Sequence, residues 1–102
     1  MAIEEITVEE LDARLAEGGR LIDVREPDEY EAGHVPSAVL IPLGTVPDNL
    51  DAFGGEGDTF VICKSGGRSM RACEYLDEHG ISAINVVGGT GAWAASGRDL
   101  EL

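Results

Sequence analysis

The stretch from Cys63 to Ser69 combines a nucleophile with residues that could stabilise its charge. It reads Cys63-Lys64-Ser65-Gly66-Gly67-Arg68-Ser69. Two adjacent glycines let a backbone turn tightly and expose its amides, and successive inward-facing amides form an anion-binding hollow. Such surroundings favour the thiolate, which is the reactive form of cysteine. We therefore predict that Cys63 is a nucleophile.

The distribution of charge supports this interpretation. Lys64, Arg68 and Arg71 are three of only seven basic residues in a chain of net charge −13, and no Asp or Glu occurs between positions 59 and 73. Nearby cations lower the pKa of a thiol because they stabilise its anion. The alternative is a buried cysteine at a strand end that acts as a small hydrophobe. The basic, glycine-containing loop favours the nucleophile.

The elements that must position this loop follow from the apolar runs. Nearly continuous apolar runs at 21–24, 38–41, 59–63 and 83–87 predict strands covered on both faces, with a weaker first strand near 3–6. Helices are predicted after a capping box at Thr7 and Glu10, and over 69–79 before Gly80. This alternation predicts an α/β fold with a parallel sheet of about five strands and helices on both faces. Cys63 would then lie at the carboxyl end of a strand, where open sheets bind ligands.

Length, charge and cysteine count narrow the class of protein. The 102 residues suit one domain spanning 1–102. The strong negative charge argues against nucleic acid and anionic membranes as partners. Two cysteines are too few for a disulfide framework, and the chain shows neither a signal-peptide pattern nor a membrane-length apolar run. We therefore expect a cytoplasmic protein with reduced thiols.

At this point the sequence resembles the single-domain rhodanese family. Cys63, Gly66 and Arg68 match the family's Cys-x-x-Gly-x-Arg loop. Three further segments resemble the family's Asp-Val-Arg, Gly-His-Ile-Pro-Gly-Ala and Gly-Gly-x-x-x-Trp motifs: 21–30, 33–38 with Ser37 in place of the usual glycine, and 88–93. Each match is weak alone, but four in the right order across nearly the whole chain are specific.

The resemblance implies a two-step sulfur transfer through a persulfide on Cys63. A small anionic donor such as thiosulfate would load the cysteine, and cyanide, a thiol or a protein acceptor would take the sulfur. Covalent catalysis of this kind divides one transfer into two steps, and the loop amides would stabilise negative charge on sulfur. No metal and no organic cofactor is required.

Individual roles can be carried over onto matching residues. Lys64 and Arg68 would attract the anionic donor, although Arg68 could instead point back and brace the loop. Arg25 resembles a family arginine that can face the substrate. Ser65 and Ser69 could hydrogen-bond the sulfur or cap the helix, and for Ser69 we favour the cap.

Two other functions are compatible with a reactive cysteine. A phosphatase of the related dual-specificity type would place one more residue between cysteine and arginine, because phosphate needs a wider loop than one sulfur atom. A module without turnover could carry sulfur or sense oxidants through Cys63, with Cys73 as a resolving thiol, but the predicted inward position of Cys73 favours a core role. The Cys63 loop favours the sulfurtransferase over both.

The remaining polar and aromatic candidates are assigned structural roles. Asp23 is expected to order backbone amides or to pair with an arginine. The only histidines, His34 and His79, lack metal-ligand spacing to a cysteine, so no zinc site is predicted. Thr90 is a candidate helix cap, and Trp93 is expected in the core.

Overall fold

A five-stranded sheet forms the centre of the molecule. The computed structural model describes residues 2–102, and its strands lie in the order β1-β5-β4-β2-β3. All four pairings are parallel. The strands are β1 (Glu5–Ile6), β2 (Arg20–Asp23), β3 (Val39–Leu40), β4 (Thr59–Ile62) and β5 (Ile84–Val86). The predicted α/β class and the parallel sheet of five strands are confirmed.

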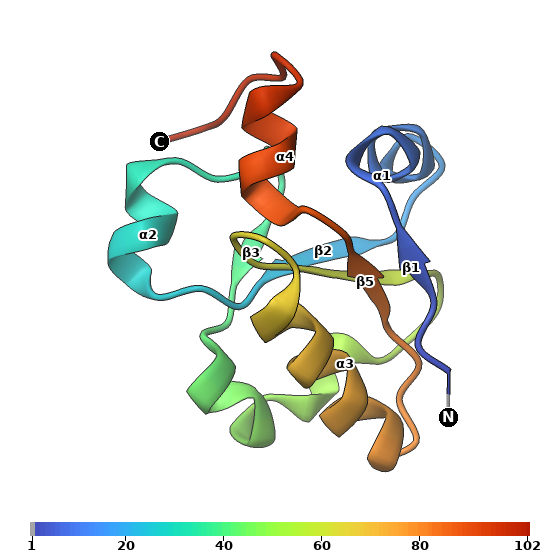
Figure 1. Ribbon diagram of the computed structural model, residues 1–102. Coiled ribbons are helices and arrows are strands. Elements are labelled where there is room, and N and C mark those ends of the chain that lie inside the picture. The colour runs from blue at the N-terminus through green and yellow to red at the C-terminus, as the bar shows by residue number, and fades with distance from the viewer. Residues whose placement is uncertain (1) are drawn as a thin grey trace.

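Helices cover both faces of this sheet, as predicted. The helices are α1 (Val8–Leu15), α2 (Pro27–Ala32), α3 (Gly67–Glu78) and α4 (Gly89–Ala95), with two short 3-10 helices, η1 (Leu43–Asp48) and η2 (Leu50–Phe53). Figure 1 shows α1, α2 and α4 above the sheet, and α3 with the 3-10 segments below it. The predicted capping box of α1 is present, since the Thr7 side chain accepts from the Glu10 amide and the Glu10 carboxylate accepts from the Thr7 amide.

The central strand β4 divides the core in two. All four of its residues are buried. Phe60 and Ile62 face the cluster that contains Trp93 of α4, whereas Val61 and Cys63 face the cluster that contains Leu76 of α3. This alternation follows from the two-residue period of a strand. It places the predicted nucleophile on the α3 side of the sheet.

The strand order of the sheet reverses between β2 and β4. The chain extends from β2 to β3 on one side and from β4 to β5 on the other. The carboxyl ends of β2 and β4 are neighbours, because Asp23 pairs with Ile62. Ligand sites in open α/β sheets lie at such reversals of strand order. The Cys63 loop therefore begins at the place where a site is expected.

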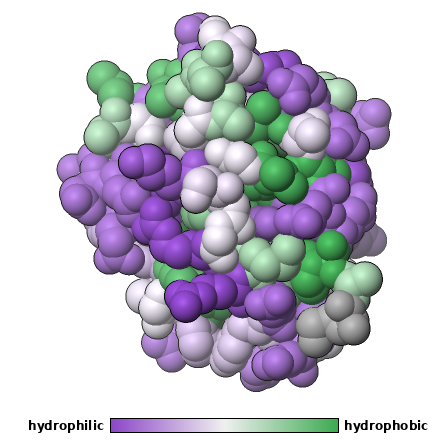
Figure 2. All heavy atoms as spheres, in the orientation of Figure 1, coloured by the Kyte–Doolittle hydropathy of each residue, from purple (hydrophilic) through white to green (hydrophobic). Residues whose placement is uncertain are grey.

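The surface is largely hydrophilic on the side shown in Figure 2, with a paler, near-neutral strip over α4. Among residues 2–102, no helix is both long and apolar enough to cross a membrane.

Candidate active site

The Cys63 sulfur lies inside a turn of backbone. Cys63 follows β4 directly and is 1% exposed. Its Sγ accepts a hydrogen bond from the Gly66 amide at 3.1 Å and one from the Ser69 hydroxyl at 3.3 Å. Gly66 adopts φ +114°, which lets the chain reverse and begin α3 at once. The sulfur is therefore held in a polar turn at the start of a helix.

These contacts lower the pKa of the Cys63 thiol. Burial acts against ionisation, but hydrogen bonds from the Ser69 hydroxyl and from the amides of Ser69, Gly66 and Ser65 outweigh it. Hydrogen bonds to the charged form of a group stabilise that form. The geometry therefore favours a thiolate on Cys63.

Ser69 corrects one of our predictions. The predicted helix began at Ser69 with that residue as its cap, but α3 begins at Gly67 and its N-cap is Gly66. Ser69 lies in the first turn of α3, where its hydroxyl is directed at Cys63 Sγ and at the Gly66 carbonyl oxygen, 3.2 Å away. The glycine in the left-handed region starts the helix early, and this frees the serine side chain to contact the sulfur. Gly80, with φ +77°, follows the helix end as predicted.

The outward-facing carbonyl groups of the loop are held by residues from β5 and α4. The Cys63 carbonyl oxygen accepts from the Thr90 amide and hydroxyl, and the Lys64 carbonyl oxygen accepts from the Gly91 amide. The buried Asn85 donates from Nδ2 to the Gly66 carbonyl oxygen at 3.3 Å. Our prediction of Thr90 as a cap was wrong, because the N-cap of α4 is Gly88 and the Thr90 hydroxyl binds the loop instead.

The two arginines of the predicted site are both engaged by carboxylates. Arg68 donates to both Glu29 oxygens, at 2.7 and 2.9 Å, and so joins α3 to α2. Arg25 is buried, pairs with Asp23 at 2.8 Å and donates to a backbone carbonyl. Arg68 is thus in the bracing arrangement that we considered as the alternative, and Asp23 has the predicted arginine partner.

Two further predicted site residues, Lys64 and Ser65, are open to solvent, as is the nearby Arg71. Lys64 and Ser65 are exposed at the tip of the loop, and Arg71 is exposed on α3. Neither Lys64 nor Arg71 forms an ion pair within residues 2–102. The free positive charges therefore lie beside the loop of an otherwise acidic molecule.

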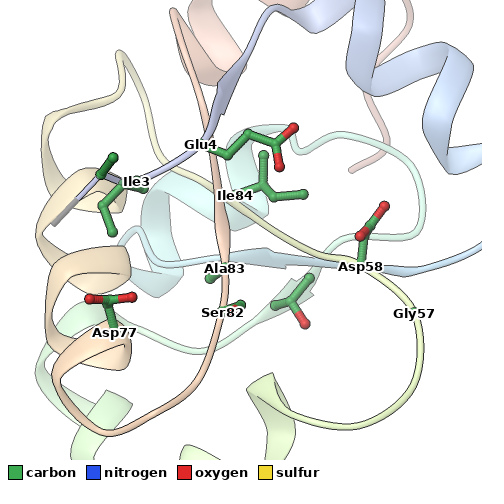
Figure 3. A pocket seen from close by; sticks show the side chains of 10 residues that line it. Ile3, Glu4, Gly57, Asp58, Asp77, Ser82, Ala83 and Ile84 are labelled. Atoms are coloured by element: carbon green, nitrogen blue, oxygen red, sulfur yellow. The ribbon is translucent and has the colours of Figure 1, made fainter.

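A separate hollow lies at the opposite, amino end of the strands. It has a volume of about 250 Å³ and is lined partly by Glu4, Asp58 and Asp77, as Figure 3 shows. Arg14 pairs with Glu4 at 2.9 Å and with Asp58 at 3.0 Å. Two of its three carboxylates, Glu4 and Asp58, thus share one arginine, and the hollow is remote from Cys63 along β4.

Cys73 and the histidines have the surroundings of structural residues. Cys73 is fully buried, and burial raises the pKa of its thiol to about 12. Among residues 2–102, no group of His, Cys, Asp and Glu side chains could hold a metal ion. His34 stacks on Tyr30 with ring centres 3.7 Å apart, and His79 lies at the end of α3. Trp93 is buried, as predicted.

Comparison with known proteins connects this geometry to a family. The family model of the rhodanese-like domain matches residues 7–96. A protein named Sulfurtransferase from Allochromatium vinosum is 37% identical over 101 residues, covering 96% of this chain and 94% of that protein. A protein named Thiosulfate sulfurtransferase 16, chloroplastic, from Arabidopsis thaliana is 35% identical, covering 81% and 80%.

A solved structure agrees with these relatives in fold as well as in sequence. The crystal structure of a rhodanese-like domain protein from Staphylococcus aureus superposes with a TM-score of 0.87 at 40% identity, covering 98% of both chains. The match includes the strands and helices that place Cys63 at the sheet reversal. This chain therefore belongs to the rhodanese-like family, as a rhodanese-domain sulfurtransferase.

Proposed function

We propose that the chain moves a sulfane sulfur from thiosulfate, or a similar anionic donor, to a thiophilic acceptor through a persulfide on Cys63. The observation that carries the proposal is the pair of hydrogen bonds to Cys63 Sγ, from the Gly66 amide and the Ser69 hydroxyl. These donors stabilise the attacking thiolate. The same turn could stabilise the negative charge of a persulfide that extends from the sulfur.

The first half-reaction would load the cysteine. The Cys63 thiolate attacks the outer sulfur of thiosulfate, the S–S bond of the donor breaks, and sulfite leaves with the bonding electrons. The exposed ammonium of Lys64, next to the nucleophile, favours the approach of an anion. Arg68 is held by Glu29, so we assign it the support of the loop.

The second half-reaction would remove the outer sulfur from the Cys63 persulfide. A nucleophilic acceptor attacks the outer sulfur of the persulfide, and the electrons of the S–S bond return to Cys63. Thiols, cyanide and protein acceptors are all thiophilic. The cycle needs no added oxidant or reductant, because the sulfur moves without a net change in its oxidation state.

The alternative functions have less support. A redox sensor with Cys73 as the resolving thiol would need a reactive second cysteine, but burial raises the pKa of the Cys73 thiol to about 12. A phosphatase needs an arginine free to bind phosphate, whereas Arg68 donates from both Nη1 and Nη2 to the Glu29 carboxylate.

Intact mass spectrometry tests the proposal directly. After incubation with thiosulfate and desalting, the protein should gain the mass of one sulfur atom and lose it again on addition of cyanide. Cys63→Ser should not load, while Cys73→Ser should load like the original chain. Loading of the Cys63→Ser variant, or a Cys63–Cys73 disulfide in place of loading, would contradict the proposal.

A further inference from the structure

A chain of hydrogen bonds runs from the edge strand β1 to the Cys63 sulfur. Glu5 of β1 and Asn85 of β5 are register partners, so their side chains lie on the same face of the sheet. Asn85 Nδ2 donates to Glu5 Oε2 at 2.9 Å and to the Gly66 carbonyl oxygen at 3.3 Å. The Gly66 amide in turn donates to Cys63 Sγ at 3.1 Å. Figure 1 shows β1 and β5 side by side, with α3 below the sheet.

Asn85 is the one polar residue of the buried strand β5. It is 1% exposed, and its neighbours Ile84 and Val86 are buried and apolar. Its Oδ1 is buried and has no hydrogen-bond partner among residues 2–102. An unpaired buried acceptor is unfavourable, and such a group in a native structure calls for an explanation. The side-chain amide nitrogen supplies one, because it faces two acceptors and donates to both.

The Gly66 carbonyl oxygen is the atom through which Asn85 acts on the site. Three donors lie within hydrogen-bond distance of it: the Met70 amide at 3.1 Å, the Ser69 hydroxyl at 3.2 Å and Asn85 Nδ2 at 3.3 Å. A carbonyl oxygen has two lone pairs. The Met70 amide is held there by the first turn of α3, so Asn85 and the Ser69 hydroxyl compete for the other lone pair.

The Ser69 hydroxyl has one proton and two acceptors within reach. It lies 3.3 Å from Cys63 Sγ and 3.2 Å from the Gly66 carbonyl oxygen. A hydroxyl group has a single O–H to donate. When the Asn85 amide occupies the second lone pair of the Gly66 oxygen, the serine proton is left for the sulfur. Without Asn85, the same proton has an open acceptor on the backbone of its own helix.

We propose that Asn85 is a positioning residue for sulfur transfer, whose amide occupies the Gly66 carbonyl oxygen and so directs the Ser69 proton to Cys63 Sγ. The other two donors to that oxygen belong to α3 and move with it. Asn85 is fixed in the sheet instead, because β5 pairs with β4, the strand that leads into Cys63. Glu5 holds the amide in the required orientation. The inference rests on the proposed function only in taking Cys63 as the nucleophile.

The experiment measures alkylation of Cys63 by iodoacetamide across pH, followed by mass spectrometry, because the thiolate is the reacting form. Asn85→Leu removes the amide donor and leaves a side chain of similar volume. Val86→Ala is the control, since it removes buried carbon from the same strand on the opposite face, in the cluster that contains Trp93. Thermal unfolding of both variants reports how much stability each has lost.

The expected result is a shift of the alkylation profile in one variant only. Asn85→Leu should lower the rate at neutral pH about two- to five-fold and move the midpoint to higher pH, because the Ser69 proton turns to the Gly66 oxygen. The same substitution in a Ser69→Ala background should have no further effect, since the proton that it redirects is absent, and this double-mutant cycle isolates the coupling. Val86→Ala should lower the unfolding free energy and leave the midpoint in place.

Glu5 offers a second pair of variants that leaves the core intact, because this residue is exposed. Glu5→Ala and Glu5→Gln remove the same negative charge, but glutamine keeps an oxygen that can accept from Asn85 Nδ2. The effect of the lost charge on Cys63 therefore cancels when the two variants are compared. Glu5→Ala should have the higher midpoint of the two, because its Asn85 amide is no longer held in place.

The outcomes that would overturn the inference are specific. An unchanged midpoint in Asn85→Leu, or an equal shift with and without the Ser69 hydroxyl, would mean that Asn85 only supports the fold. Where Asn85→Leu does not fold, equal midpoints in the two Glu5 variants would overturn the inference. A chain that thiosulfate never loads, but whose midpoint moves as expected, would support this inference and contradict the proposed function.

Discussion

Thr90 holds the carbonyl oxygen of Cys63 through two hydrogen bonds, from its amide at 2.8 Å and from its hydroxyl at 3.0 Å. The nucleophile is therefore fixed from behind by a residue 27 positions later in the chain. With this carbonyl turned outward, the amides that follow Cys63 are free to turn towards its sulfur. The start of α4 thus acts on the site through the backbone of the loop.

Replacing the Thr90 hydroxyl by a methyl group should lower the activity of the site without leaving a cavity in the core. Thr90→Val keeps the shape of the side chain and the backbone amide but removes the hydroxyl that donates to the Cys63 carbonyl oxygen. Loss of one hydrogen bond of about 1 kcal/mol should lower kcat/KM about five-fold. Thr90→Ser keeps the hydroxyl and should restore most of the rate. The measurement is thiosulfate-dependent turnover with cyanide. Equal activity of the valine and serine variants would show that the hydroxyl does not position Cys63.

Gly89 should be far more sensitive to a methyl group than a glycine elsewhere. A Cβ on Gly89 would meet the Cys63 carbonyl oxygen and lie 2.7 Å from the Lys64 carbonyl oxygen. Gly97 also has a positive φ, +85°, but no atom lies within 4 Å of its Cβ position. Gly97→Ala should cost about 1–2 kcal/mol of unfolding free energy from backbone strain alone.

Gly89→Ala carries a similar strain at φ +57° and adds a clash with the active-site loop. It should lower the unfolding free energy further than Gly97→Ala and slow alkylation of Cys63 by iodoacetamide. Both effects can be measured by thermal unfolding and by mass spectrometry of the alkylated protein. Equal losses in the two variants would mean that the loop can move away from α4 at no cost.

The local features of the site could be predicted from the sequence. The loop from Cys63 to Ser69 carries its nucleophile, glycines and cations within seven consecutive positions, and the apolar run at 59–63 indicates the strand before it. Continuous apolar runs likewise identify the interior strands, whereas the edge strand β3 is only two residues long and its Val39 is exposed.

The long-range partners could not be predicted in this way. Glu29 lies 39 positions before Arg68, and Asn85 lies 19 positions after Gly66. Their pairing depends on how α2 and β5 are placed around the sheet, and spacing along the chain does not specify this. The prediction that Ser69 caps the helix was wrong for a related reason. A serine side chain can either cap a helix or donate to a sulfur atom. Because Gly66 adopts the left-handed conformation and is itself the N-cap of α3, the Ser69 hydroxyl is left to contact the sulfur.

The turn at Ser37 should be a site of stabilisation. Ser37 is the only non-glycine residue among 2–102 with a positive φ, +75°, and it stands where the family motif usually has glycine. The left-handed region costs an L-residue about 1–2 kcal/mol, and glycine avoids this at a smaller entropic cost. Ser37→Gly should therefore raise the unfolding free energy by about 0.5–1 kcal/mol. Ser82→Gly, also exposed but at a negative φ, should lower it.

The ion pair between Arg68 and Glu29 should make stability depend on acid pH. Hydrogen bonds from Arg68 lower the pKa of Glu29 from 4.5 to about 2. Because the folded-state pKa is below the unfolded one, the contribution is present above about pH 4.5 and is lost as the pH falls to about 2. Since the ion pair is partly exposed, we expect it to contribute about 1 kcal/mol to the unfolding free energy. Glu29→Gln should remove this pH-dependent part of the unfolding free energy, and Glu31→Gln, on the same helix, should not.

Ser69 should control the ionisation of Cys63 through its side chain, and Ser65 through its backbone only. Of the groups that lower the pKa of the Cys63 thiol, the Ser69 hydroxyl contributes most, whereas Ser65 contributes its amide. Ser69→Ala should therefore raise the pKa of Cys63 and reduce the alkylation rate at neutral pH about five-fold, for a hydrogen bond of about 1 kcal/mol.

Ser65→Ala keeps the amide and provides the matched control, with an unchanged pH profile. Iodoacetamide alkylation measured across pH reports Cys63 alone at neutral pH, since the buried Cys73 thiol has a pKa of about 12. If Ser69→Ala leaves the midpoint of this profile in place, the backbone amides alone set the reactivity of the sulfur. The hydroxyl contact at 3.3 Å would then have no part in ionising it.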